Sequence, residues 1–167
     1  MITIVIVTLV VGVVLGLALQ KAAQAYRTFR GMRVLTCPEN QQPAAVEVEA
    51  WHAALSAILG RPAPRVRDCS RWPERRQCDQ GCVRVILGAP NATLVENIVA
   101  NWCRYNACMC CGAPLAKLRV GRHQPHLINQ DLHIFDWNEV PPQELPQTLR
   151  RCEPVCETCL VAETHIW

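Results

Sequence analysis

The sequence lacks the local signatures of the common catalytic and nucleotide-binding sites. Its 167 residues contain no glycine-rich phosphate loop, no H-E-x-x-H helix and no G-x-S-x-G nucleophile turn. Of the five histidines, His123 and His126 lie closest together, but no carboxylate or third ligand stands at a spacing that would complete a metal site. These absences favour a non-catalytic protein with no evident small-molecule substrate.

A strong positive charge is also missing. The formal net charge is +3, and four of the positive residues, Lys21, Arg27, Arg30 and Arg33, directly follow an apolar run. The rest of the chain therefore has no positive excess, whereas a dedicated nucleic-acid-binding domain is usually far more basic. We interpret the arginine-rich stretch 65–76 as a solvated face or a contact for an acidic partner, and we consider a nucleic-acid partner unlikely.

No charged side chain interrupts the stretch from Ile2 to Leu19. At helical rise these eighteen residues measure about 27 Å, close to the thickness of the hydrocarbon core of a bilayer. Residues 1–20 are therefore predicted to form a single transmembrane helix. The alternative is a cleaved secretory signal, since Ala23-Gln24-Ala25 has the small-x-small form of a cleavage site. The absence of a basic segment before the run, and the length of the run, favour an uncleaved anchor.

The charges that flank the apolar run predict its orientation. Only the α-amine precedes the run, whereas the juxtamembrane segment 21–33 is basic, and basic flanks stay on the cytoplasmic side. The N-terminus is expected outside and the remaining chain in the cytoplasm, where thiols stay reduced and clustered cysteines favour metal over disulfides. The reversed topology would turn the same cysteines into a disulfide framework.

Two features of the chain suggest contacts with other membrane-protein subunits. Gly12 and Gly16 form a Gly-x-x-x-Gly pair on one face of the predicted span, which would let a second helix approach closely. The C-terminal Trp167 is a candidate for docking onto a partner. The expected partners are thus the lipid bilayer and other subunits within it.

Eleven cysteines are the most informative residues present. In a first module, residues 34–90, strands are predicted at 33–37 and 45–49 and a helix at 50–59. Cys78 and Cys82 are expected one turn apart on a helix face. Four thiolates in this module are predicted to converge on one metal ion: Cys37, Cys69, Cys78 and Cys82. An ordinary buried thiol at Cys37 or Cys69 is the alternative.

In a second module, residues 91–167, two Cys-x-x-Cys pairs lie 44 residues apart in the pattern typical of a structural zinc site. The pairs are Cys108 with Cys111, and Cys156 with Cys159. A hairpin formed by 115–120 and 131–135 and a helix over 160–166 are expected around them. This combination of knuckle, hairpin and helix resembles the treble-clef and zinc-ribbon class of four-cysteine modules, which implies a structural zinc held by the two pairs.

The knuckle leaves one ligand open, because Cys110 lies beside Cys111. We favour Cys111, since Gly112 permits a tight turn under the metal. Cys103, in an amphipathic stretch, is expected to be a core thiol. Cys152 is not assigned to either metal site, and a spare ligand or a redox partner is the alternative for it. Two structural Zn2+ sites are expected, with iron as the alternative; ferredoxin spacing and a Cys-x-x-Cys-His haem motif are absent.

Together these features predict an α+β protein, with one N-terminal transmembrane helix followed by two small cysteine-rich, zinc-stabilised modules. The expected function is that of a membrane-anchored, non-catalytic accessory or scaffold subunit of a larger membrane complex, for which respiratory or photosynthetic assemblies are reasonable hosts. The alternative is a membrane-tethered redox carrier with iron bound by four cysteines.

Overall fold

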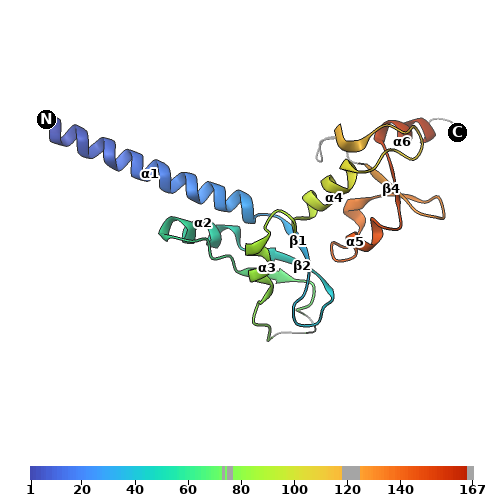
Figure 1. Ribbon diagram of the computed structural model, residues 1–167, viewed down its shortest axis with the longest axis horizontal. Coiled ribbons are helices and arrows are strands. Elements are labelled where there is room, and N and C mark those ends of the chain that lie inside the picture. The colour runs from blue at the N-terminus through green and yellow to red at the C-terminus, as the bar shows by residue number, and fades with distance from the viewer. Residues whose placement is uncertain (73, 75–76, 118–124, 165–167) are drawn as a thin grey trace.

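A long N-terminal helix projects from a mixed α+β body in the computed structural model of the protein (Figure 1). The structure describes residues 1–72, 74, 77–117 and 125–164. Helix α1 runs from Ile2 to Phe29. Its apolar part is long enough to cross a membrane, a test that an N-terminal signal sequence also passes. The helix ends before Gly31, whose φ of +94° turns the chain away from the helix axis.

The chain next forms an antiparallel three-stranded sheet in the order β1-β2-β3. Its strands are β1 (Met32–Thr36), β2 (Pro43–Val48) and β3 (Val66–Cys69). β1 and β2 lie where the sequence predicts strands, and α2 (Ala50–Leu59) has the predicted bounds. β3 pairs with β2 so that Cys69 lies opposite Val46.

Helix α3 (Cys82–Gly88) follows, and it corrects the predicted helix through Cys78. Gln80, with a φ of +57°, and the helix-capping Gly81 turn the chain just before Cys82. A helix cannot pass through a residue in the left-handed region. Cys78 therefore lies in a loop, and the prediction that Cys78 and Cys82 share a helix face is wrong.

Helix α2 packs along the C-terminal half of α1 (Figure 1). On α1, Ala25 and Phe29 are buried and Ala18, Ala22 and Tyr26 are half-buried, while their neighbours toward the N-terminus are exposed. On α2 the buried residues are Ala53, Ala54 and Ala57. Alanine on both faces lets the two helix backbones approach closely.

Short elements make up the rest of the body. They are α4 (Val95–Arg104), the 3-10 turns η1 (Leu115–Lys117) and η2 (Trp137–Glu139), α5 (Leu145–Thr148) and α6 (Glu157–Thr164). The second antiparallel sheet has the order β5-β4-β6, with β4 at His126–Ile128, β5 at Ile134–Asp136 and β6 at Glu153–Val155.

The predicted hairpin is therefore wrong in its first strand. Residues Leu115–Lys117 form a 3-10 turn, and Leu115 is buried in the core. Residues 118–120 lie outside the described residues. The strand that pairs with β5 is instead β4. The predicted helix over 160–166 begins earlier, at Glu157, and its last two expected residues lie outside the described part.

Among the described residues, two hydrophobic clusters form the core. One gathers apolar residues of α1, β2, α2 and α3, and the other gathers those of α4, β4, α5 and β6. β1 belongs to both, because Leu35 packs into the first cluster and Val34 into the second. One strand thus joins the two clusters, and the division into modules at residue 90 stays a prediction.

Candidate metal centres

Four thiols from two distant segments meet in the C-terminal half of the chain. Cys108 opens a tight loop in which the Gly112 N–H donates to the Cys108 carbonyl at 2.9 Å, and an isolated bridge between Ala107 and Pro114 closes the loop. Gly112 has a φ of +68°, the left-handed conformation that favours glycine. The loop is the predicted knuckle, and it directs Cys108 and Cys111 to the same side.

Cys156 and Cys159 reach this loop from the other segment. Cys156 directly follows β6, and Cys159 lies in the first turn of α6, where its N–H donates to the Cys156 carbonyl at 3.0 Å. The Met109 N–H donates to the Pro154 carbonyl at 2.9 Å and so attaches the knuckle to β6. This backbone hydrogen bond and the shared hydrophobic cluster, which includes Cys108 and Cys156, bring the two cysteine pairs together.

The geometry of the four sulfurs suits one tetrahedral ion. The Sγ atoms of Cys108, Cys111, Cys156 and Cys159 all lie within 4.8 Å of one another. Cys111 and Cys156 are 3.7 Å apart, Sγ to Sγ. A disulfide needs about 2.05 Å, whereas two ligands on a tetrahedral zinc with Zn–S bonds of about 2.3 Å lie about 3.8 Å apart. The cluster can hold a metal ion.

Hydrogen bonding prepares Cys108 to be a thiolate. Burial raises its pKa, but the backbone N–H groups of Cys156, Cys111 and Cys110 donate to its sulfur and together lower the pKa to about 6. The Cys156 N–H lies 3.3 Å from the Cys108 Sγ. The pKa of Cys159 is raised, mainly because its thiol hydrogen-bonds to the Cys156 and Cys111 side chains. These hydrogen bonds therefore favour the thiolate form of Cys108 and the protonated form of Cys159.

The remaining cysteines of this half do not join the cluster. Cys110 is exposed and lies outside the group of four, in agreement with the prediction that Cys111 is the ligand. Cys103 is buried on α4, and burial raises its pKa to about 11, which suits an inert core thiol. Cys152 is also buried, and burial followed by the charge of Glu153 raises its pKa.

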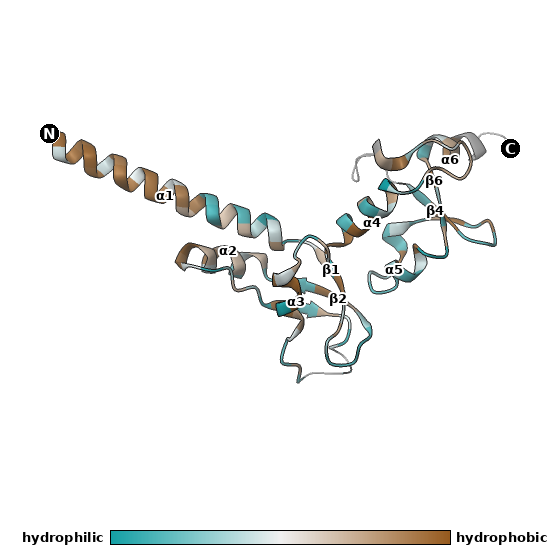
Figure 2. Cartoon of the chain, viewed as in Figure 1, coloured by the Kyte–Doolittle hydropathy of each residue, from teal (hydrophilic) through white to brown (hydrophobic). Residues whose placement is uncertain are grey.

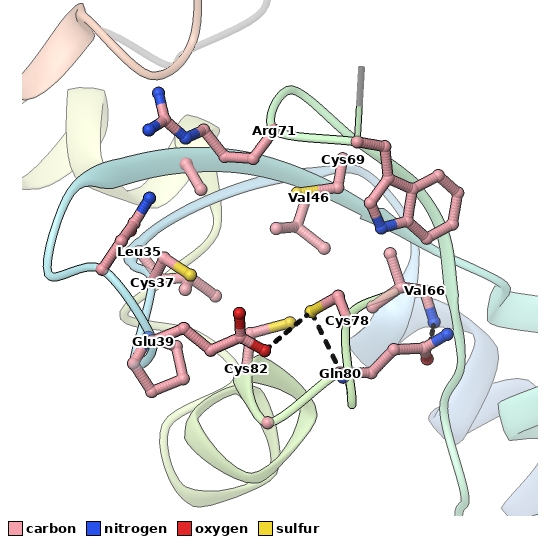
Figure 3. Close-up of a pocket in the computed structure, with 15 residues that line it drawn as sticks. Leu35, Cys37, Glu39, Val46, Val66, Cys69, Arg71, Cys78, Gln80 and Cys82 are labelled. Carbon is pink, nitrogen blue, oxygen red and sulfur yellow. Dashed lines mark hydrogen bonds between the residues drawn. The ribbon is translucent and has the colours of Figure 1, made fainter. Parts of the chain in front are cut away.

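The other four predicted ligands, Cys37, Cys69, Cys78 and Cys82, line a single cavity beside the first sheet, and Figure 3 shows their sulfurs around the same hollow. Cys37 follows β1, Cys69 ends β3, Cys78 lies in the loop and Cys82 opens α3. The cavity has a volume of about 20 Å³, which admits one water-sized or ion-sized guest. Its walls are otherwise mainly apolar.

This first set is looser than the second. Among the described residues, no three of its four sulfurs lie within 4.8 Å of one another, as all four sulfurs of the C-terminal cluster do. Instead, Cys78 forms a compact group with Glu39 and Asp79, two carboxylates that spacing between cysteines does not reveal. The Cys78 thiol donates to Glu39 Oε1 at 3.3 Å and its sulfur accepts from the Gln80 N–H at 3.4 Å. The role of the four cysteines as metal ligands stays a prediction.

Electrostatics link the thiols of the first cavity. Burial, followed by the charges of Cys69, Cys78 and Cys37, raises the pKa of Cys82 to about 11. The Gln80 N–H acts to lower the pKa of Cys78, but burial and the neighbouring Glu39 and Asp79 outweigh it, so the pKa is raised. A bound cation would relieve this mutual repulsion between thiolates.

The predicted partner contacts are less defined. Gly12 and Gly16 have nothing within 4 Å of an added Cβ, so the described chain leaves this face of α1 open. Trp167 and His123 lie outside the described residues. No family model matches the chain, and comparison with the curated proteins and with the solved structures gave no match.

Proposed function

We propose that this chain is a non-catalytic accessory or scaffold subunit, anchored in a membrane by α1 and stabilised by zinc. The observation that carries the proposal is the compact cluster of four thiols, Cys108, Cys111, Cys156 and Cys159, in a chain whose first helix is long and apolar enough to cross a bilayer. All four positions of a zinc ion would be filled by protein, as in structural sites, whereas catalytic sites keep one position open.

The same proposal assigns a second zinc to the cavity of Cys37, Cys69, Cys78 and Cys82. Support comes from the convergence of four thiols on a space for one ion. The wider spacing of these sulfurs implies that they close on the metal when it binds. Domains with small hydrophobic cores commonly need a bound metal ion to be stable.

A treble-clef-like architecture is proposed for the C-terminal site. The supporting elements occur in the expected order: a knuckle with two cysteines, the β4-β5 hairpin, and a helix, α6, that begins between the last two cysteines. β6 joins this hairpin and brings Cys156 to the knuckle.

We further propose that the body faces the cytoplasm and that the N-terminus lies outside, because the basic residues cluster on one side of the apolar span. Partner subunits would then be recruited within the membrane through Gly12 and Gly16, or in the cytoplasm through Trp167. Respiratory or photosynthetic complexes are suitable hosts for such a subunit.

Metal content per chain tests the proposal most directly. Full-length protein purified in detergent should contain two zinc ions per chain by mass spectrometry of the metal. The Cys156→Ser variant should lose the C-terminal ion and Cys69→Ser the other, while Cys103→Ala, which alters a core thiol, should keep both. Protein without bound metal would contradict the zinc assignment.

The absorption spectrum of the same preparation separates the scaffold from the alternative redox carrier. Zinc thiolates are colourless in the visible range, whereas iron bound by four cysteines gives visible charge-transfer bands and undergoes one-electron reduction. Native membranes solubilised in mild detergent should show the protein in a larger complex. Migration of the chain alone would argue against an accessory subunit.

A further inference from the structure

The outer face of α2 is apolar and uncovered. Trp51, Leu55, Ile58 and Leu59 expose 71%, 61%, 41% and 91% of their surfaces, which matches the exposure of the apolar side chains along the span of α1. Figure 2 shows α2 as hydrophobic at the end that points toward the N-terminal half of α1. A helix that is apolar on all sides is normally buried in protein or in lipid.

The two polar side chains of α2 do not contribute to this outer face. His52 Nδ1 lies 2.7 Å from the Ala63 carbonyl oxygen. Ser56 Oγ donates to the His52 carbonyl at 2.8 Å and accepts from the Ala63 N–H at 2.8 Å. Both are therefore engaged by the segment that returns from the helix, and the outer face presents only apolar side chains.

The register of α2 on α1 places this face beside the apolar span. The rings of Trp51 and Tyr26 have centroids 5.0 Å apart. Because α2 runs back along α1, Leu59, two turns beyond Trp51, lies about 12 Å nearer the membrane. Leu59 therefore lies at the level of Ala18, which is eight residues before Tyr26 on α1. Ala18 belongs to the apolar run from Ile2 to Leu19, and it is half-buried there.

We propose that α2 is a membrane-contacting helix, whose outer face enters the headgroup and outer acyl region of the leaflet from which α1 emerges. The occupant of this face is phospholipid. The inference rests on the proposed function, because it requires α1 to be inserted in a membrane.

The surroundings of α2 suit this position. Trp51 and Tyr26 form an aromatic pair about two turns beyond Leu19, on the water side of the apolar run, where amphipathic rings favour the membrane interface. Leu55 lies between this pair and Leu59. Lys21 on α1 and Arg61 after α2 are both exposed. Their long side chains can extend to lipid phosphates while their stems remain among apolar groups.

Photo-cross-linking in vesicles tests the proposal. Full-length protein carrying p-benzoylphenylalanine at Leu59 is reconstituted in vesicles of phosphatidylcholine and phosphatidylglycerol and irradiated. The matched control carries the same residue at Tyr105, which is exposed by 82% at the end of α4. Neither side chain is packed, so both variants should fold, and their zinc content should equal that of the unmodified chain.

The proposal predicts a phospholipid adduct on the peptide that contains residue 59 and none on the peptide that contains residue 105. Cross-links from residue 59 to a second protein chain, or no lipid adduct there, would overturn it. Extraction by alkaline carbonate is measured in parallel. A chain that resists extraction without forming an adduct refutes only the contact of α2, whereas a chain released by carbonate refutes the anchor and this inference with it.

Discussion

At the scale of single residues, the C-terminal site depends on the placement of one sulfur. Cys110 and Cys111 are adjacent in sequence, yet only Cys111 lies in the group of four. Gly112, in the left-handed conformation, reverses the chain directly after Cys111 and so fixes which thiol faces Cys156. A one-residue shift would direct the wrong sulfur into the site.

Serine substitution at these two neighbours should have opposite outcomes. Cys111→Ser removes a thiolate from the proposed zinc and should weaken metal binding at least about a hundredfold, since even outer contacts of a metal contribute about 10- to 100-fold. Cys110→Ser should leave affinity unchanged. Competition with a chromogenic chelator measures both. Equal losses in the two variants would mean that the ligand assignment is wrong.

The depressed pKa of Cys108 predicts how the stability of metal-free protein depends on pH. Its folded pKa is about 6 and its ordinary value is 9.0. Folding therefore favours the thiolate, and this stabilisation is complete above pH 9 and is lost as the pH falls to 6. The raised pKa of Cys159 affects the pH dependence of stability only above pH 9. Below that value its thiol is protonated in both the folded and the unfolded state.

Denaturant unfolding of metal-free protein between about pH 6 and pH 9 tests this prediction. Stability should increase with pH in the unmodified chain and should increase less in Cys108→Ser. The same slope in both proteins would show that Cys108 is an ordinary thiol.

At the scale of elements, the junction between α1 and the body depends on the buried Arg33 in β1. Arg33 is fully buried and donates to the Thr28 and Pro90 carbonyls and, at 3.1 Å, to Thr93 Oγ1. Its guanidinium lies 5.8 Å from the centre of the Phe29 ring. Burial lowers its pKa. One side chain thus joins the end of α1 to the segment that precedes α4.

Arg33→Met should destabilise this junction. Two partly buried carbonyls, those of Thr28 and Pro90, would lose their donors, at a cost of about 3 kcal/mol in the free energy of unfolding. Thr93→Val, which removes a single hydroxyl acceptor, should cost only about 1 kcal/mol. Urea unfolding in detergent, followed by tryptophan fluorescence, measures both variants. A smaller loss in Arg33→Met than in Thr93→Val would contradict the account of the junction.

At the scale of the whole molecule, the proposed orientation of α1 determines on which side of the membrane the thiols of the body would lie. The proposed zinc sites require reduced cysteines, and the basic flank of α1 favours the reducing side of a membrane. If α1 spans the membrane as proposed, α2, packed against α1, would hold the body close to the membrane surface.

Protease treatment of sealed cells should leave the body intact. If the N-terminus is outside, only the few residues before the span are accessible, so full-length protein should persist until the membrane is permeabilised. A protein known to lie on the outer side of the same membrane serves as the control for access. Degradation before permeabilisation would reverse the topology and would favour disulfides over zinc.

The sequence alone was sufficient to predict the features that depend on residues close together in the chain. The absence of charge over Ile2–Leu19 predicts a helix that can span a membrane. A short run that ends at Pro38 predicts β1, alternation predicts β2, and apolar residues at helical spacing that end at Gly60 predict α2. Two Cys-x-x-Cys pairs predict the C-terminal cluster, because each pair is confined to a short turn. The treble-clef resemblance and the two zinc ions remain proposals.

Only the tertiary structure decided what depends on the path of the chain between these segments. The left-handed Gln80 placed Cys78 outside α3, and the burial of Leu115 replaced an expected strand with a turn. The association of Glu39 with Cys78 and of α2 with α1 joins residues that no local pattern connects. Spacing constrains neighbours through the backbone, whereas contacts between distant residues arise only when the whole chain packs.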